Sequence, residues 1–177
     1  MFHFNQRRRW SALACALAAA AASASAAELR YEMAFYEERP GGPQIAGGDY
    51  AAAIAEAARR VRSRDLETAL VAATNLCVAH TVRGELAAAA PRCDDAVRLA
   101  RRMDDGRFAR TGAHATTARA LSNRGVLRAM TGDTGGAAAD FVAAMRRTRA
   151  WDAPGRNLAR LERDAQDRVA RARDGGD

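Results

Sequence analysis

The side chains that could carry out chemistry are few and scattered along this chain of 177 residues. Beyond residues 1–26, the only histidines are His80 and His114, and the only cysteines are Cys77 and Cys93. Nucleophilic catalysis needs a serine or cysteine beside a general base, and no recognised motif supplies such a pair. A metal site built on the two cysteines and His80 would lack a fourth ligand. The sequence therefore predicts a protein that is not an enzyme and that binds no cofactor.

Three glycines divide the chain into similar pieces. Each is followed by an acidic residue and then by an alanine-rich run, at Gly48-Asp49, Gly84-Glu85 and Gly132-Asp133. Good helix formers dominate from Asp49 onward, and no run beyond it alternates as a strand would. The sequence predicts an all-α fold with helices near 49–63, 67–83, 85–103, 113–131, 133–150 and 155–173.

The second and third pieces resemble the tetratricopeptide repeat. Segment 70–103 carries Asn75, Leu76, Cys77, Gly84, Ala89, Cys93 and Ala96, and segment 118–151 carries Asn123, Gly125, Gly132, Ala137, Phe141 and Ala144. Small residues at these places let two antiparallel helices approach closely, and the glycine lets the chain reverse. The resemblance implies a short α-solenoid in residues 48–177, with a half repeat at 48–66 and a capping helix at 155–173. Residues 103–112 form an inserted loop, read either as a specificity loop or as a longer connection.

The resemblance also implies where the protein binds. Such repeats bind along the concave face of their first helices, which here would present Val71, Thr74, Val78, Val82, Ser122, Val126 and Met130. The basic clamp by which some family members hold a terminal carboxylate is missing, so the expected groove is apolar and suits a peptide or protein. With so few repeats, the same residues could instead be core.

The repeat alignment implies one covalent pairing. It places Cys77 and Cys93 at the two facing positions where the helices of the hairpin come closest. In an oxidising compartment this predicts a Cys77–Cys93 disulfide, and the alternative is two buried thiols.

The first 26 residues are typical of a signal peptide. Arg7, Arg8 and Arg9 precede an uncharged run, and Ala24-Ser25-Ala26 fits a cleavage site. We expect a small bacterial protein of the periplasm or secreted, with no stable membrane span after cleavage. The net charge of +7 is spread among alternating acidic and basic residues, which argues against nucleic acid as a partner.

Residues 27–47 contain a short alternating stretch and a Pro/Gly loop. Leu29, Tyr31, Met33 and Phe35 alternate with other residues, which is typical of an extended segment. Three readings stay open: the segment fills the groove of its own molecule, binds a partner, or packs loosely or as a helix. The sequence thus predicts a non-enzymatic adaptor of the cell envelope that binds a protein or peptide. The alternative is a self-associating structural protein, a homo-oligomer whose groove is filled by its own or a twin chain's segment.

Overall fold

The computed structural model describes residues 30–105 and 113–174. Within these residues there are seven helices and no strand, which confirms the predicted all-α fold. The helices are α1 (Gly42–Ala46), α2 (Tyr50–Ala58), α3 (Leu66–Val82), α4 (Leu86–Asp104), α5 (Ala113–Met130), α6 (Thr134–Arg147) and α7 (Ala153–Asp174).

The helix boundaries follow from capping residues and glycine turns. Asp49, Asp65 and Asp133 each accept a hydrogen bond from the backbone N–H three residues later, at the starts of α2, α3 and α6. Gly84 lies at the turn between α3 and α4, and Gly132 lies at the turn between α5 and α6. Their φ angles are 73° and 86°, a conformation that other residues rarely adopt. The repeated Gly-acid pair therefore ends one helix and positions the next.

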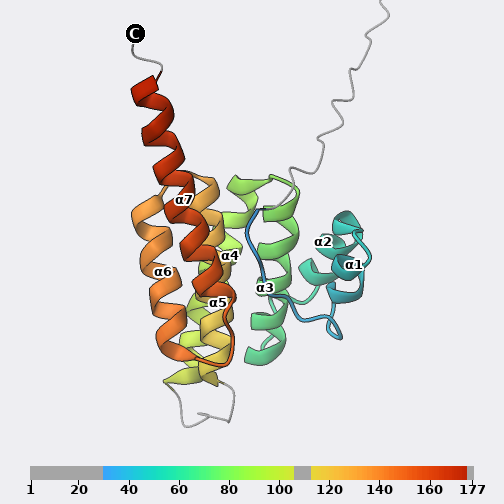
Figure 1. The fold of residues 1–177 in the computed structure, drawn as a ribbon. Coiled ribbons are helices and arrows are strands. Elements are labelled where there is room, and N and C mark those ends of the chain that lie inside the picture. Colours follow the sequence, from blue (N-terminus) through green and yellow to red (C-terminus); the bar gives the residue numbers. More distant parts are fainter. Residues whose placement is uncertain (1–29, 106–112, 175–177) are drawn as a thin grey trace, which may run out of the picture.

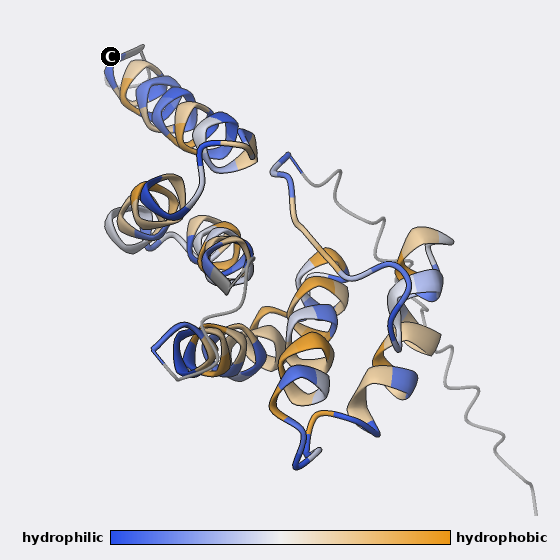
Figure 2. Ribbon diagram, turned by 90° about the horizontal axis from the view of Figure 1, so that it is seen from below, coloured by the Kyte–Doolittle hydropathy of each residue, from blue (hydrophilic) through white to orange (hydrophobic). Residues whose placement is uncertain are grey.

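The helices pack in the order of the sequence. Each one contacts the next, and α3 also contacts α1 and α5, while α5 also contacts α7. Figure 1 shows α3 to α7 standing side by side, and Figure 2 shows the helices forming an arc with residues 30–36 on its inner side. The odd-numbered helices from α3 to α7 thus line one continuous face.

Helix α3 lies at the centre of this arrangement. All of its residues from Ala69 to Ala79 are buried. Clusters of buried residues join it to α4 and α5 on one side and to α2 on the other. Helix α3 therefore forms one end of the face that α3, α5 and α7 line.

Three elements differ from the expected boundaries. Helix α2 ends at Ala58, and the next residues form tight turns that bring Val61 against the core clusters. The short helix α1 lies within the segment expected to be extended and loop-like. Pro43 stands in its first turn, where proline favours a helix, and Ile45 is buried. Residues 103 and 104, expected in the inserted loop, form the end of α4.

Some expectations lie outside the described residues. These are the signal peptide 1–26, Leu29 and residues 106–112 of the inserted loop. Among the helices that the structure does describe, none is long and apolar enough to cross a membrane.

Candidate functional site

Residues 30–36, here called the N-terminal segment, lie extended across α3, α5 and α7. Three asparagines on these helices hold its backbone, and we call Asn75, Asn123 and Asn157 the asparagine ladder. Each accepts a hydrogen bond from one backbone N–H of the segment at 2.9 Å. Each also donates to the carbonyl oxygen of the same segment residue, at 2.6 to 3.2 Å. The three helices therefore each bind the backbone of the N-terminal segment, at three places along it.

The ladder bonds alternate residues of the segment. Asn157 bonds Glu32, Asn123 bonds Ala34 and Asn75 bonds Tyr36. An extended chain presents the N–H and C=O of every second residue to the same edge, so one such edge faces the helices. No described residue bonds the backbone of Met33 or Phe35, which belong to the opposite edge. The segment therefore lies edge-on, running from α7 towards α3.

Asparagine suits this role because its carboxamide carries both a donor and an acceptor. Asn75 and Asn123 are 1% exposed and Asn157 is 2% exposed. A buried carboxamide without partners would be costly, so each needs the backbone groups that it bonds. Asn75 uses its second N–H as well, donating to the carbonyl of Pro40 at 3.0 Å. That bond fixes the turn that follows the segment.

The side chains of Tyr31, Met33 and Phe35 lie on the apolar side of the segment. Met33 packs against three clusters, which are built around Val78, around the Cys77–Cys93 pair and around Val126. Phe35 joins the cluster shared by α1, α2 and α3. The segment therefore covers apolar residues on α3, α5 and α7, the three helices that hold its backbone.

Tyr31 combines an apolar and a polar contact. Its ring stacks on Phe141, with the centroids 6.5 Å apart, and its hydroxyl donates to Asp164 at 2.9 Å. Burial raises the pKa of Tyr31 to about 12, and the hydrogen bond to the Asp164 carboxylate adds to the rise. The neutral phenol is the form that fits this place.

The other side of the segment carries charge and an aromatic ring. Arg156 donates two hydrogen bonds to Glu32, both at 2.6 Å, and this lowers the pKa of the Glu32 carboxyl. The guanidinium of Arg119 lies 5.6 Å from the centre of the Tyr36 ring. Because these pairs are exposed, they contribute to register more than to affinity.

The residues expected to line an open groove are covered. Val71, Thr74, Val78, Ser122 and Val126 are buried, at 4% exposure or less. Val78 and Val82 share a cluster with Met33 and Phe35, and Val126 and Met130 share one with Tyr31 and Met33.

Two of these residues make no hydrogen bond to the segment. The hydroxyl of Thr74 donates to the carbonyl of Leu70 within α3 at 2.9 Å. The buried oxygen of Ser122 has no hydrogen-bond partner among the described residues. The expected groove residues that share apolar clusters with the segment, Val78, Val82, Val126 and Met130, lie in the C-terminal halves of α3 and α5.

The asparagines were not among the residues predicted to bind. Asn75 and Asn123 mark matching positions of the two similar segments 70–103 and 118–151, and Asn157 follows Asn123 by 34 residues (157 − 123). That recurrence is the signal that could have found them.

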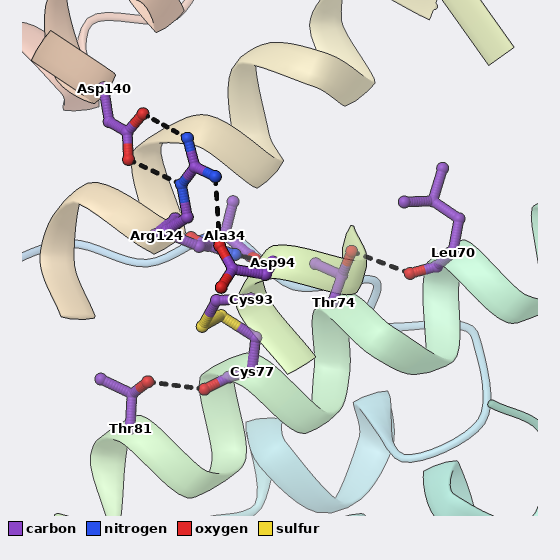
Figure 3. Close-up of a disulfide and its surroundings, with 10 residues drawn as sticks. Ala34, Leu70, Thr74, Cys77, Thr81, Cys93, Asp94, Arg124 and Asp140 are labelled. Atoms are coloured by element: carbon purple, nitrogen blue, oxygen red, sulfur yellow. Dashed lines mark hydrogen bonds and ion pairs between the residues drawn. A yellow bond between two sulfur atoms is a disulfide. The ribbon is translucent and has the colours of Figure 1, made fainter. Parts of the chain in front are cut away.

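The structure contains the predicted disulfide. Cys77 on α3 and Cys93 on α4 are bonded, with Cα atoms 4.8 Å apart and both residues fully buried. Figure 3 shows the pair beneath the docked Ala34. The bond joins the two helices of a hairpin directly under the site.

An ion-pair network centred on the buried Asp140 braces the helices behind the site. Arg124 donates to both oxygens of Asp140 at 2.8 Å, and Arg128 donates to Asp140 at 2.9 Å (Figure 3 shows the Arg124 pair). Arg124 also reaches Asp94 at 3.1 Å, so α4, α5 and α6 are tied together. The Asp140 carboxylate raises the pKa of Arg124, which stays charged. All four charges are paired, which fits a structural role.

The histidines are also paired. His80 contacts Glu85 at 2.6 Å and His114 contacts Asp104 at 2.9 Å. Over residues 30–105 and 113–174, no three His, Cys, Asp or Glu side chains gather in a way that could hold a metal ion. The candidate functional site is therefore the asparagine ladder together with the N-terminal segment, whose extended backbone the ladder binds.

Comparison of the chain with family models, with curated proteins and with solved structures finds no match.

Proposed function

We propose that this protein is a small α-solenoid of tetratricopeptide-like hairpins. Sequential packing of the helices supports this assignment. So does a recurring pair, in which each ladder asparagine is followed two residues later by a small residue, Cys77, Gly125 or Ala159. On this reading α7 is the first helix of a further repeat, and it serves as the cap.

The proposed activity is non-enzymatic binding of an extended polypeptide. One observation carries it: three buried asparagines on three successive first helices each bond both polar backbone groups of alternate residues in one strand. Contacts to backbone do not depend on the identity of the bound side chains. A strand from another protein could therefore occupy the same place, which is the action of an adaptor.

We propose the bacterial cell envelope as the setting, after removal of residues 1–26. The basic and apolar pattern of those residues supports export. A buried disulfide supports an oxidising compartment.

Self-association is the second candidate, and the length of chain between the segment and the ladder allows it. Every ladder contact to the segment comes from a residue at least 39 positions away in sequence. The segment of a twin chain would make the same contacts. The compact turn from Tyr36 to Gly42, which the ladder also holds through Pro40, favours docking within one chain.

The test combines binding and size measurements on the purified full chain. Immobilised peptides of varied sequence, some extended and some rich in proline, would be probed with Glu32→Arg, in which the protein's own segment is loosened, and with Glu32→Arg combined with Asn123→Leu. We expect extended peptides to be retained by Glu32→Arg and lost by the double variant. Light scattering over a hundredfold range of concentration distinguishes the second candidate, because self-association alone predicts growth in mass. Equal retention by both proteins would reject the ladder as the binding site.

A further inference from the structure

We infer that the partner is a peptide segment of another protein whose side chains follow the pattern of this chain's own residues 31–36. This rests on the proposed function and specifies its ligand. The pattern is an aromatic residue with a hydroxyl, an acid, a long apolar residue, a small residue and two aromatics. The N-terminal segment is then a tethered competitor that occupies the site until the partner replaces it.

The ladder fixes the conformation of the partner, and Arg156 selects its direction. Asn157, Asn123 and Asn75 need an N–H and a C=O from alternate residues, so the bound peptide must be extended at those three places. The acid that pairs with Arg156 must stand at the α7 end. A peptide running the other way would place its acid at the α3 end, by Arg119 rather than Arg156.

The positions between the ladder bonds set side-chain preference. The first position requires a flat ring that stacks on Phe141 and a hydroxyl that reaches Asp164. The middle position requires a long flexible apolar side chain, because Met33 meets three separate clusters there. The third position requires an apolar side chain, because Phe35 packs there against the cluster that contains Val78 and Val82.

Tethering explains how a matching partner could compete. A docked segment on a short linker acts at an effective concentration of the order of millimolar. A partner with the same pattern would therefore bind weakly to the closed protein and much more tightly to a protein whose own segment is loosened. Arg30 and Glu32 at one end of the segment, and Glu37, Glu38 and Arg39 at the other, are exposed, so an incoming chain can reach both ends.

Two variants of the full chain loosen the segment. Glu32→Arg places a cation against Arg156 at an exposed position, with no change to the core. Met33→Asp places a charge among three apolar clusters and is the stronger variant. Arg98→Glu, on the exposed side of α4, is the matched control for a reversed surface charge. Circular dichroism checks that each variant keeps its helices, and Glu32→Arg remains informative if Met33→Asp unfolds.

The probe is a fluorescent peptide with the sequence of residues 30–39, titrated by anisotropy. We expect its affinity to rise about threefold in Glu32→Arg, because the lost ion pair is exposed, and about tenfold or more in Met33→Asp, relative to the wild type and to Arg98→Glu. Methylation of the peptide nitrogen at the Ala34 position should weaken binding at least tenfold, because it removes the N–H that donates to the Oδ1 of Asn123. Methylation at the Met33 position should change it less than threefold, since no described residue accepts from that N–H.

Three results would overturn the inference, and each has a separate meaning. If peptides with polar residues at positions 31, 33 and 35 bind as well as the probe, the side-chain pattern is wrong while backbone binding stands. If no peptide binds either loosened variant, the proposed function fails together with the inference. If the loosened variants form dimers that ignore the peptide, the segment serves a second copy instead of competing with a partner.

Discussion

Asn123 and Ala34 exchange two hydrogen bonds across 89 residues of sequence, at 2.9 Å and 2.6 Å. The carboxamide of a buried helix side chain takes the place that a neighbouring strand would hold in a sheet. An all-helical protein thereby holds a single extended chain in place. The predictions below test this bond, the close contacts beneath it and the groups that keep the segment docked.

Replacing Asn123 with leucine should release the centre of the segment. The change removes both bonds and leaves the N–H and C=O of Ala34 facing an apolar side chain, at a cost of about 1–3 kcal/mol for an unpaired group. Hydrogen exchange of the Ala34 amide should accelerate by about 10- to 100-fold. The amide of Met33, unbonded by any described residue, is an internal control that should exchange at the same rate in both proteins. An unchanged Ala34 rate would show that the asparagine does not hold it.

Gly125 and Gly135 should respond in opposite directions to the same substitution. A Cβ at Gly125 would lie 2.7 Å from the ring of Phe141, whereas a Cβ at Gly135 would meet nothing within 4 Å. Gly125→Ala should lower the free energy of unfolding by about 1–2 kcal/mol, because overpacking outweighs the gain in helix propensity. Gly135→Ala should raise it by about 0.5–1 kcal/mol.

Urea unfolding of the two glycine variants measures both values. A smaller side chain opposite Gly125, as in Phe141→Leu, should recover part of the loss when combined with Gly125→Ala. Stabilisation by Gly125→Ala alone is the outcome that the close approach of α5 and α6 does not allow.

Removing the disulfide should lower stability without separating the hairpin. The bond closes a loop with a sequence separation of 16 residues, which corresponds to about 3 kcal/mol in the chain-entropy description. Cys77→Ala combined with Cys93→Ala should lower the melting temperature by about 6–12 °C. A reducing agent should lower the melting temperature of the wild type by a similar amount and leave the double variant unchanged. Equal melting curves for the wild type with and without reductant would mean that the bond does not form.

Alkaline pH should weaken the docking of Tyr31. Its pKa is raised from an ordinary value near 10 to about 12, so the stability that its neutral phenol contributes is complete below pH 10 and is lost as pH rises through 12. The difference in unfolding free energy between the wild type and Tyr31→Phe should be constant up to pH 10 and change between pH 10 and 12. Tyr50, on α2, offers a matched variant in Tyr50→Phe. A pH dependence of the same size for Tyr50→Phe would locate the effect elsewhere.

Sequence reasoning reached the elements that depend on local rules. Gly84 and Gly132 predicted two chain reversals because a positive φ excludes most residues, and Asp133 predicted a helix start because it caps one. The pairing of Cys77 with Cys93 was also predicted, since the repeat pattern places both at the closest approach of two helices.

The ladder could not be reached in the same way. Asn75 and Asn123 were visible as repeat markers, but a helical asparagine has several uses, and their target is backbone, which leaves no trace in sequence. The expectation of an open groove overlooked burial along α3 and α5, where Val71, Thr74 and Ser122 are enclosed. Helix α1 was missed because only the tertiary contacts of Ile45 and the adjoining turn make so short a helix stable.

The ladder keeps an even step although the chain between its members does not. Asn75 and Asn123 are 48 residues apart in sequence (123 − 75) and Asn123 and Asn157 are 34 apart (157 − 123), yet both pairs bond residues two positions apart in the N-terminal segment. The two-residue step along the segment is set by the lateral spacing of the helices. It does not depend on the connections between them. A protein built this way could grow by whole hairpins, each lengthening the strand it holds by two residues.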